Sequence, residues 1–262
     1  MNTICEYIKY IRKAQGRHQI HSPYVYDFVD VCLQKALPVT LKNQLTSIRK
    51  ELRNNHTPID QFDLGAGSKI KESINTIARV YKKSSSKGTF FNLLYQISSH
   101  YQPKLVLELG TNLGLGTIAL ASGIKSGKVI SIEGCKNTLT IAQENISKLK
   151  LQNIELINTS FDNYLDNLNN VQFDVVYIDG DHKGKSLERY LNQLKEFTHD
   201  ETVFILDDIR WSNDMFFTWN KISQSSNYQL SMDLFKIGIL VKKQSKYKEH
   251  FVIKIKNILK SM

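Results

Sequence analysis

The stretch LVLELGTNLGLGT, residues 105–117, decides how the fold is interpreted. A short apolar run predicts a buried strand, with Glu108 near its carboxyl end. Gly110 and Gly114 follow, and a helical segment begins near Thr117. In open α/β sheets, ligands bind at the carboxyl ends of parallel strands, where glycines let the backbone approach a ligand closely. The stretch therefore predicts a cofactor-binding loop.

The next apolar run, KVISIE at residues 128–133, supports this interpretation. Its last residue, Glu133, stands about 20 residues after the loop, where an acidic side chain can accept hydrogen bonds from ribose hydroxyls. Three residues separate Gly110 from Gly114, so the loop lacks the GxGxxG spacing of a pyrophosphate turn. This spacing argues against NAD and favours a nucleoside cofactor without phosphates.

A second glycine-rich stretch, FDLGAGSKIK at residues 62–71, competes for the same role. The apolar run before it is only a few residues long, and no later strand ends in a suitably placed acid. We therefore expect Gly65 and Gly67 to form a structural turn. We place this turn away from the nucleoside of the cofactor.

The wider pattern predicts an α/β fold. From residue 104, short apolar runs alternate with helical segments, which is typical of a mostly parallel sheet covered on both faces. Two apolar runs between residues 228 and 243 predict an antiparallel pair at the end of the sheet. Residues 1–100 are expected to be mostly helical, with helices over 24–37, 41–53 and 70–83. We divide the chain into a helical extension (1–87), a core domain (88–243) and a basic tail (244–262).

Composition narrows the classes of function. The 262 residues carry 35 Lys and Arg against 25 Asp and Glu, a formal net charge of +10. The simplest interpretation is a lysine-rich solvated surface, although RNA stays open as a partner. No apolar run reaches the ~18–20 residues of a membrane span. Three scattered cysteines do not make a disulfide framework, so we expect a cytoplasmic protein with free thiols.

Four motifs, in this order and spacing, then point to a family: ELGTNLG (108–114), SIE (131–133), YIDGDH (177–182) and DDIRW (207–211). From about residue 88 to 243 the chain resembles class I S-adenosylmethionine-dependent methyltransferases. It is most similar to the metal-dependent O-methyltransferases of the catechol and caffeoyl-coenzyme A type. The resemblance implies a Rossmann-like seven-stranded sheet, mostly parallel, with the last strand antiparallel. HQIHSPYVYDF and DLGAGS resemble an N-terminal extension of a bacterial subgroup, and we expect this extension, with its glycine turn, to form a lid on the side of the site where the methyl acceptor binds.

The resemblance also implies roles for matched residues. A cofactor set would line S-adenosylmethionine: Glu108, Gly110, Thr111, Gly114, Glu133, Ser160, Phe161 and Asp179. A carboxylate set would bind a divalent cation, Mg²⁺ or Ca²⁺: Asp179, Asp207 and Asp208. The catalytic residues would be Asp179 and His182, with His182 as the candidate general base and Lys183 or Lys185 as alternatives. Asp208 departs from the family, in which Asn is usual. Trp211 matches a tryptophan of bacterial relatives, and either core packing or stacking on the acceptor fits it.

We therefore expect a metal-assisted O-methyltransferase acting on a small hydroxylated molecule, with a homodimer allowed by exposed apolar N-terminal helices. Two alternatives stay open. The net charge is compatible with methylation of RNA or another macromolecule. Departures from the family at Gly116, Thr159 and Asp208 are compatible with a protein that binds the cofactor without transferring methyl groups.

Overall fold

An eight-stranded sheet forms the centre of the computed structural model, which describes residues 3–63, 71–83, 88–242 and 247–255. The strand order is β10-β8-β9-β7-β6-β3-β4-β5. The strands are β3 (Leu105–Leu109), β4 (Lys128–Glu133), β5 (Ile154–Asn158), β6 (Phe173–Ile178), β7 (Thr198–Leu206), β8 (Leu230–Leu234), β9 (Ile237–Val241) and β10 (Glu249–Val252).

The sheet confirms the predicted fold class and adds one strand to it. All neighbouring pairs are parallel except β7–β9 and β8–β9, so β9 runs opposite to its neighbours, as expected near the end of the chain. The eighth strand, β10, pairs in parallel with β8 at the edge. It comes from the basic segment after residue 243, described above as a tail. Residues Ile253 and Ile255 just beyond it are buried, which explains why this segment joins the sheet.

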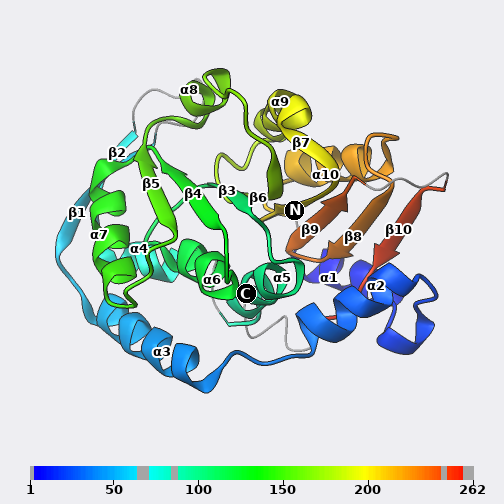
Figure 1. Ribbon diagram of the computed structural model, residues 1–262, viewed down its shortest axis with the longest axis horizontal. Helices are drawn as coiled ribbons and strands as arrows, with labels where there is room; N and C mark the ends of the chain where they lie inside the picture. Colours follow the sequence, from blue (N-terminus) through cyan, green and yellow to red (C-terminus); the bar gives the residue numbers. More distant parts are fainter. Residues whose placement is uncertain (1–2, 64–70, 84–87, 243–246, 256–262) are drawn as a thin grey trace.

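Helices cover both faces of the sheet (Figure 1). One face carries α6 (Leu115–Gly123), α7 (Lys136–Ser147) and the N-terminal helices. The other carries α8 (Phe161–Asp166), α9 (Gly184–Gln193), the short η3 (Leu194–Phe197) and α10 (Asn213–Gln224). Each face has its own buried apolar cluster, and inner strands such as β6 and β9 are buried on both sides. This two-sided burial is why the strands appear in the sequence as continuous apolar runs.

The N-terminal extension is mostly helical, as predicted. It contains α1 (Thr3–Lys13), η1 (Arg17–Gln19), α2 (Pro23–Phe28), η2 (Val29–Leu33), α3 (Val39–Asn54) and α4 (Ile77–Lys83), and it is followed by α5 (Thr89–Tyr101). It also holds β10 in place: Gln15 N donates to Val252 O at 2.7 Å, and the Tyr10 hydroxyl donates to Ile253 O. Figure 1 shows the first helices (blue) beside β10 (red).

The helix predicted over residues 70–83 is wrong in its first half. Residues Lys71–Thr76 form β2, which pairs antiparallel with β1 (Pro58–Asp63), and the helix begins only at Ile77. Pairing with a neighbouring strand overrides local helix propensity here, because propensity differences are small beside a full set of ladder bonds.

The β1–β2 hairpin packs beside α7 (Figure 1). Asp60 O accepts a hydrogen bond from Asn137 Nδ2 at 2.9 Å, close to the start of α7. The predicted glycine turn at Gly65 and Gly67 lies outside the described residues. The described strands nevertheless bring the hairpin to the side of the sheet where β4 ends in Glu133.

None of the helices among the described residues is both long enough and apolar enough to cross a membrane.

Candidate active site

The predicted cofactor loop lies at the carboxyl edge of the sheet, between β3 and α6. Gly110 has a φ of +113°, and a Cβ at this position would stand 2.1 Å from Asp179 O. Gly114 has a φ of +80° and precedes α6. Both positions need glycine, since side chains rarely adopt these backbone angles. Gly110 N and Thr111 N both donate to Ile132 O, which fixes the loop against β4.

Glu108 is fully buried behind this loop. Its Oε2 accepts hydrogen bonds from Thr117 Oγ1 and Ser131 Oγ, each at 2.5 Å. Its Oε1 is buried with no hydrogen-bond partner in the described part of the protein. Burial raises the pKa of Glu108 to about 7, although the two hydroxyl donors oppose the shift. A buried acceptor without a donor is costly, so Oε1 fits a ligand that carries a charged or polar N–H.

Glu133 ends β4 beside the same loop. Its Oε2 accepts from Asn112 N at 2.8 Å and its Oε1 accepts from Cys135 N at 2.9 Å. These bonds orient the carboxylate, and each carboxylate oxygen can accept a further hydrogen bond. The predicted role in binding a ribose is therefore compatible with the geometry.

Ser160 and Phe161 of the predicted cofactor set stand at the start of α8. Ser160 caps this helix, because its Oγ accepts from Asn163 N at 3.2 Å. The Phe161 ring packs edge-on against Tyr190, with ring centroids 5.8 Å apart. It also covers Gly180, where a Cβ would stand 2.6 Å from the ring. Phe161 thus lies next to the residues that follow β6.

Three carboxylates meet where β6 and β7 end. The Tyr177 hydroxyl lies 3.0 Å from Asp179 Oδ2 and 3.3 Å from Asp207 Oδ2, so it bridges the two side chains. Burial, followed by the charges of Asp207 and Asp208, raises the pKa of Asp179 well above its usual value. Burial and the charge of Asp207 also raise the pKa of Asp208. The structure therefore brings the predicted carboxylate set together.

A lysine enters this cluster from the turn between β8 and β9. Lys236 Nζ lies 3.5 Å from Asp207 Oδ1 and 3.4 Å from Asp208 Oδ1. Burial alone would lower the pKa of Lys236, but the carboxylates of Asp207, Asp208 and Asp179 outweigh it and raise that pKa. The ammonium group is therefore held in its charged form beside the acids.

This donor set does not fit the predicted Mg²⁺ or Ca²⁺ site. Asp207 Oδ1 already accepts from Asp208 N at 2.7 Å, and its Oδ2 faces the Tyr177 hydroxyl. A divalent ion about 4 Å from the Lys236 ammonium would be repelled by about 8 kcal/mol at an effective dielectric constant of 20. Within the described ranges, no group of three or more His, Cys, Asp and Glu side chains has the arrangement of a metal site.

His182 and Trp211 form the outer part of the cluster. His182 Nε2 lies 3.7 Å from Asp208 Oδ2, and its ring centroid is 5.3 Å from that of Trp211. Trp211 is 66% exposed, which makes core packing the wrong alternative for it. Lys183, proposed as an alternative base, pairs with Asp181 at 3.1 Å.

Backbone strain marks the same edge of the sheet. Four non-glycine residues there have positive φ values between 46° and 70°: Asn112, Asp181, Asp208 and Phe235. They follow β3, β6 and β7 and precede β9. Such conformations are costly outside glycine and tend to gather at functional sites.

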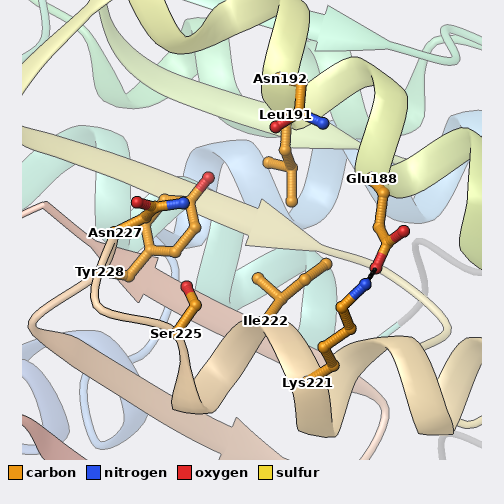
Figure 2. Close-up of a pocket in the computed structure, with 8 residues that line it drawn as sticks. All are labelled: Glu188, Leu191, Asn192, Lys221, Ile222, Ser225, Asn227 and Tyr228. Carbon is orange, nitrogen blue, oxygen red and sulfur yellow. Dashed lines mark hydrogen bonds and ion pairs between the residues drawn. The ribbon is translucent and has the colours of Figure 1, made fainter.

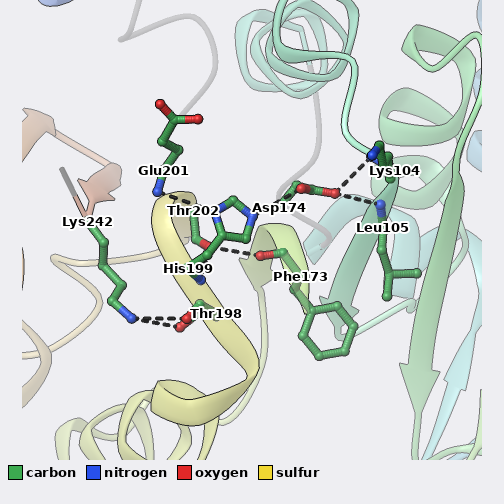
Figure 3. Close-up of polar contacts among 9 residues, drawn as sticks. All are labelled: Lys104, Leu105, Phe173, Asp174, Thr198, His199, Glu201, Thr202 and Lys242. Carbon is green, nitrogen blue, oxygen red and sulfur yellow. Dashed lines mark hydrogen bonds and ion pairs between the residues drawn. The ribbon is translucent and has the colours of Figure 1, made fainter. Parts of the chain in front are cut away.

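Two other polar clusters lie away from this edge. Figure 2 shows a pocket between α9 and α10 with a rim ion pair, Lys221 Nζ to Glu188 Oε1 at 2.7 Å. Figure 3 shows Asp174 at the amino end of β6, accepting at 2.8 Å from Lys104 N and Leu105 N and facing His199 Nε2 at 3.0 Å. The second cluster ties together the amino ends of the strands, so we assign it to stability.

Comparison with known proteins agrees with this geometry. Residues 107–209 match the family model described as a methyltransferase domain. An O-methyltransferase from Bacillus cereus in complex with SAH is 20% identical, with 84% of this chain and 97% of that chain covered and a TM-score of 0.55. The chain has the class I methyltransferase fold. An SAH-bound methyltransferase from Podospora anserina shares this fold at 12% identity, with 86% and 97% coverage and a TM-score of 0.59.

A third solved structure extends this set. An O-methyltransferase from Streptomyces achromogenes, involved in tomaymycin synthesis and in complex with SAM, is 14% identical, with 83% and 94% coverage and a TM-score of 0.55. No curated protein matches the sequence of this chain. The shared methyltransferase fold places the ends of β3, β4, β6 and β7 at one edge, where the predicted residues meet.

Several residues of this site escaped the sequence analysis. Ser131 and Tyr177 flank Glu108 in the strand register, and each stands two residues before a predicted acid. The two-residue period of a strand places each on the same face as that acid, which is a usable signal. Lys236 had no such signal, because it lies in a turn and reaches the acids only through strand order.

Proposed function

We propose that this chain is an S-adenosylmethionine-dependent methyltransferase that methylates a hydroxyl oxygen of a small molecule. The observation that carries the proposal is the pairing of the Gly110 loop with Glu108, whose buried Oε1 has no hydrogen-bond partner in the described part of the protein. The matching methyltransferase domain and the neighbours crystallised with SAH or SAM support it.

The residues on the cofactor side of the site bind S-adenosylmethionine and orient it. S-Adenosylmethionine, when bound, supplies a methyl group whose bond to sulfur breaks, leaving the electron pair on sulfur, as the acceptor oxygen bonds to the methyl carbon. Glu108 Oε1 is the acceptor for the amino group of the methionine part. Glu133, oriented by Asn112 N and Cys135 N, is the acceptor for ribose hydroxyls. The absence of a side chain at Gly110 leaves room for close approach.

The residues of the acceptor side handle a proton. The acceptor hydroxyl must lose its proton as the new bond forms, and His182 is the proposed general base. Its side chain is 27% exposed, so an acceptor can reach it, and Asp208 at 3.7 Å stabilises the ring once it is protonated. Asp179 joins the two sides, because its backbone oxygen borders Gly110 and its carboxylate borders Asp207.

Titration calorimetry with SAH and with S-adenosylmethionine tests the proposal. We expect binding of both in the range of about 1 µM to 1 mM that is usual for enzyme substrates. Gly110→Ala should abolish binding, whereas Glu155→Gln, an exposed change on β5, should not alter it. Heat signals indistinguishable from dilution for both ligands would refute the proposed function.

The choice of acceptor needs separate experiments. Methylation of RNA would require binding that weakens steeply with salt, because phosphate contacts release counterions. Flat, weak RNA binding between 50 and 200 mM salt, about the range over which such proteins lose affinity, would exclude it. Methyl transfer to any small hydroxylated compound would exclude the hypothesis that the protein binds the cofactor without catalysing a reaction.

The assembly state and location complete the proposal. We propose a homodimer formed through α1, because Ile4 and Ile8 of this helix are 72% and 47% exposed. Light scattering after gel filtration tests it, and a monomeric mass at high concentration would reject it. We also propose a cytoplasmic location, where reduced thiols are usual; the described part of the structure contains no disulfide among its three cysteines.

A further inference from the structure

The turn between β8 and β9 places a positive charge inside the acidic cluster. Lys236 Nζ stands 3.4 Å from Asp208 Oδ1 and 3.5 Å from Asp207 Oδ1. Tight charge-assisted bonds are about 2.7–2.9 Å long, so the ammonium is shared loosely between the two carboxylates. An ammonium group carries three N–H donors, which leaves capacity for one further oxygen. The Lys236 side chain is 16% exposed and is therefore not sealed from the site.

Contacts from several elements hold this lysine in position. Its backbone oxygen accepts from Ile209 N at 3.0 Å, which ties the turn to the loop after β7. Its ammonium lies 5.3 Å from the centroid of the Phe90 ring on α5. The preceding residue, Phe235, has a φ of +70°, so the turn has a defined and strained shape.

The N-terminal extension supports the same turn. The Phe235 ring packs edge-on against Tyr7 at 5.3 Å and tilted against Tyr10 at 5.2 Å, both from α1. The Arg210 guanidinium lies 5.0 Å from the Phe235 centroid and pairs with Asp233. Helix α1 thus positions the lysine from a distance, which gives the extension a role in the site.

We propose that the Lys236 ammonium takes the place of a divalent cation among Asp179, Asp207 and Asp208 and binds the reacting oxygen of the acceptor. This inference rests on the proposed function and deepens it. The ammonium donates a hydrogen bond to the acceptor hydroxyl oxygen, and its charge stabilises that oxygen as the proton leaves for His182. A metal ion can chelate two neighbouring oxygens, whereas an ammonium holds one. The acceptor class is therefore a compound with a single reacting hydroxyl, and no adjacent chelating oxygen is required.

Binding of Mn²⁺ alone, followed by electron paramagnetic resonance on the full chain, tests this inference without an acceptor. The wild type and Lys236→Arg should leave Mn²⁺ free, because each keeps a cation in the cluster. Lys236→Ala and Lys236→Met should bind Mn²⁺ about tenfold more tightly or better, since the repelling charge is gone. Lys236→Met keeps a long unbranched side chain in place of the lysine and so serves as the second, better-packed variant. Adding Asp207→Asn should remove the gained binding.

Control measurements distinguish a change in Mn²⁺ binding from a loss of folding and from a failure of the proposed function. Lys221→Ala removes an exposed ion-paired lysine on α10 and should behave as the wild type. SAH titration and thermal melting on each variant report the fold and the cofactor site independently of Mn²⁺. Tight Mn²⁺ binding by the wild type would overturn the inference, because the lysine would not exclude a metal. Absence of binding in both Lys236 variants, with SAH binding intact, would also overturn it, because the acids would then form no cation site.

Discussion

Replacing Glu108 by glutamine should separate the stability of this fold from its ability to bind the cofactor. The carboxyl is fully buried, and burial raises its pKa from 4.5 to about 7. Between these values the folded protein binds more protons than the unfolded chain. Stability is therefore lost as the pH rises from about 4.5 through about 7, and the loss is complete above that range.

The size of this effect follows from the shift. At 1.36 kcal/mol per pKa unit, the ionised carboxyl costs about 3 kcal/mol at pH 8 and under about 1 kcal/mol at pH 5. Glutamine has nearly the same shape and no charge. Glu108→Gln should therefore gain about 2–3 kcal/mol more at pH 8 than at pH 5. For a protein of this size, that difference corresponds to roughly 5–10 °C in Tm.

The same substitution should weaken cofactor binding. Glutamine can still accept from Thr117 and Ser131 through its carbonyl oxygen, but it then turns an amide N–H toward the position of Oε1. A hydrogen bond from a charged amino group is worth about 1.5–3 kcal/mol, so affinity for SAH should fall about ten- to a hundredfold. Titration calorimetry at pH 8 measures this loss.

Glu155→Gln is the matched control for both measurements. Glu155 lies on β5, is about half exposed and pairs with Lys128 on the surface. Its replacement should change stability by no more than about 0.5 kcal/mol at either pH and leave SAH affinity unaltered. Equal gains for Glu108→Gln at pH 5 and pH 8 would refute the argument from burial. Undiminished SAH affinity would refute the assignment of Oε1 to the cofactor.

Three further substitutions test other parts of the site. Gly110→Ala should destabilise the protein by more than about 3 kcal/mol in thermal or denaturant melts, because the added Cβ would stand 2.1 Å from the backbone oxygen of Asp179. Gly88→Ala should cost only about 1–2 kcal/mol, because Gly88 has a φ of +54° but open space around it, and equal losses of stability in the two variants would contradict the argument from close approach. Asp233→Asn should lower the free energy of unfolding in urea by about 3–5 kcal/mol, since it leaves the buried Arg210 guanidinium without the carboxylate that it contacts at 2.6 and 2.7 Å. A loss below about 1 kcal/mol would show that water reaches this pair. Trp211→Ala should leave Tm nearly unchanged, because the side chain is 66% exposed, and it should raise KM for the acceptor. A large fall in Tm would show that Trp211 packs in the core instead.

Much of the fold could be predicted because its signals are local. The inner strands of the sheet, from β3 to β9 without the edge strand β5, are largely buried on both faces, so they appear as short apolar runs separated by helical segments. Gly110 and Gly114 have positive φ values, which only glycine adopts readily, so these two glycines were enough to locate the loop in the sequence. Local signals failed over residues 71–76, where pairing with β1 decided the conformation.

The meeting of the carboxylates was also predictable from the sequence, but the positive charge that balances them was not. Asp179 and Asp207 each follow a parallel strand, and parallel strands end at the same edge of a sheet, so their meeting follows from strand order. The charge that balances them comes from Lys236, which the insertion of β9 between β7 and β8 brings to that edge.

By itself, the sequence determined strands β3 to β9, the glycine loop after β3 and the acids at the strand ends, because each depends on neighbours within a few residues. Only the tertiary structure decided which cation lies among those acids. A turn residue has no periodic signature, and the partner it meets depends on strand order and on the register that sets Leu206 opposite Gly238. The contacts of Phe235 with α1 likewise join residues from opposite ends of the chain, which no local pattern can encode.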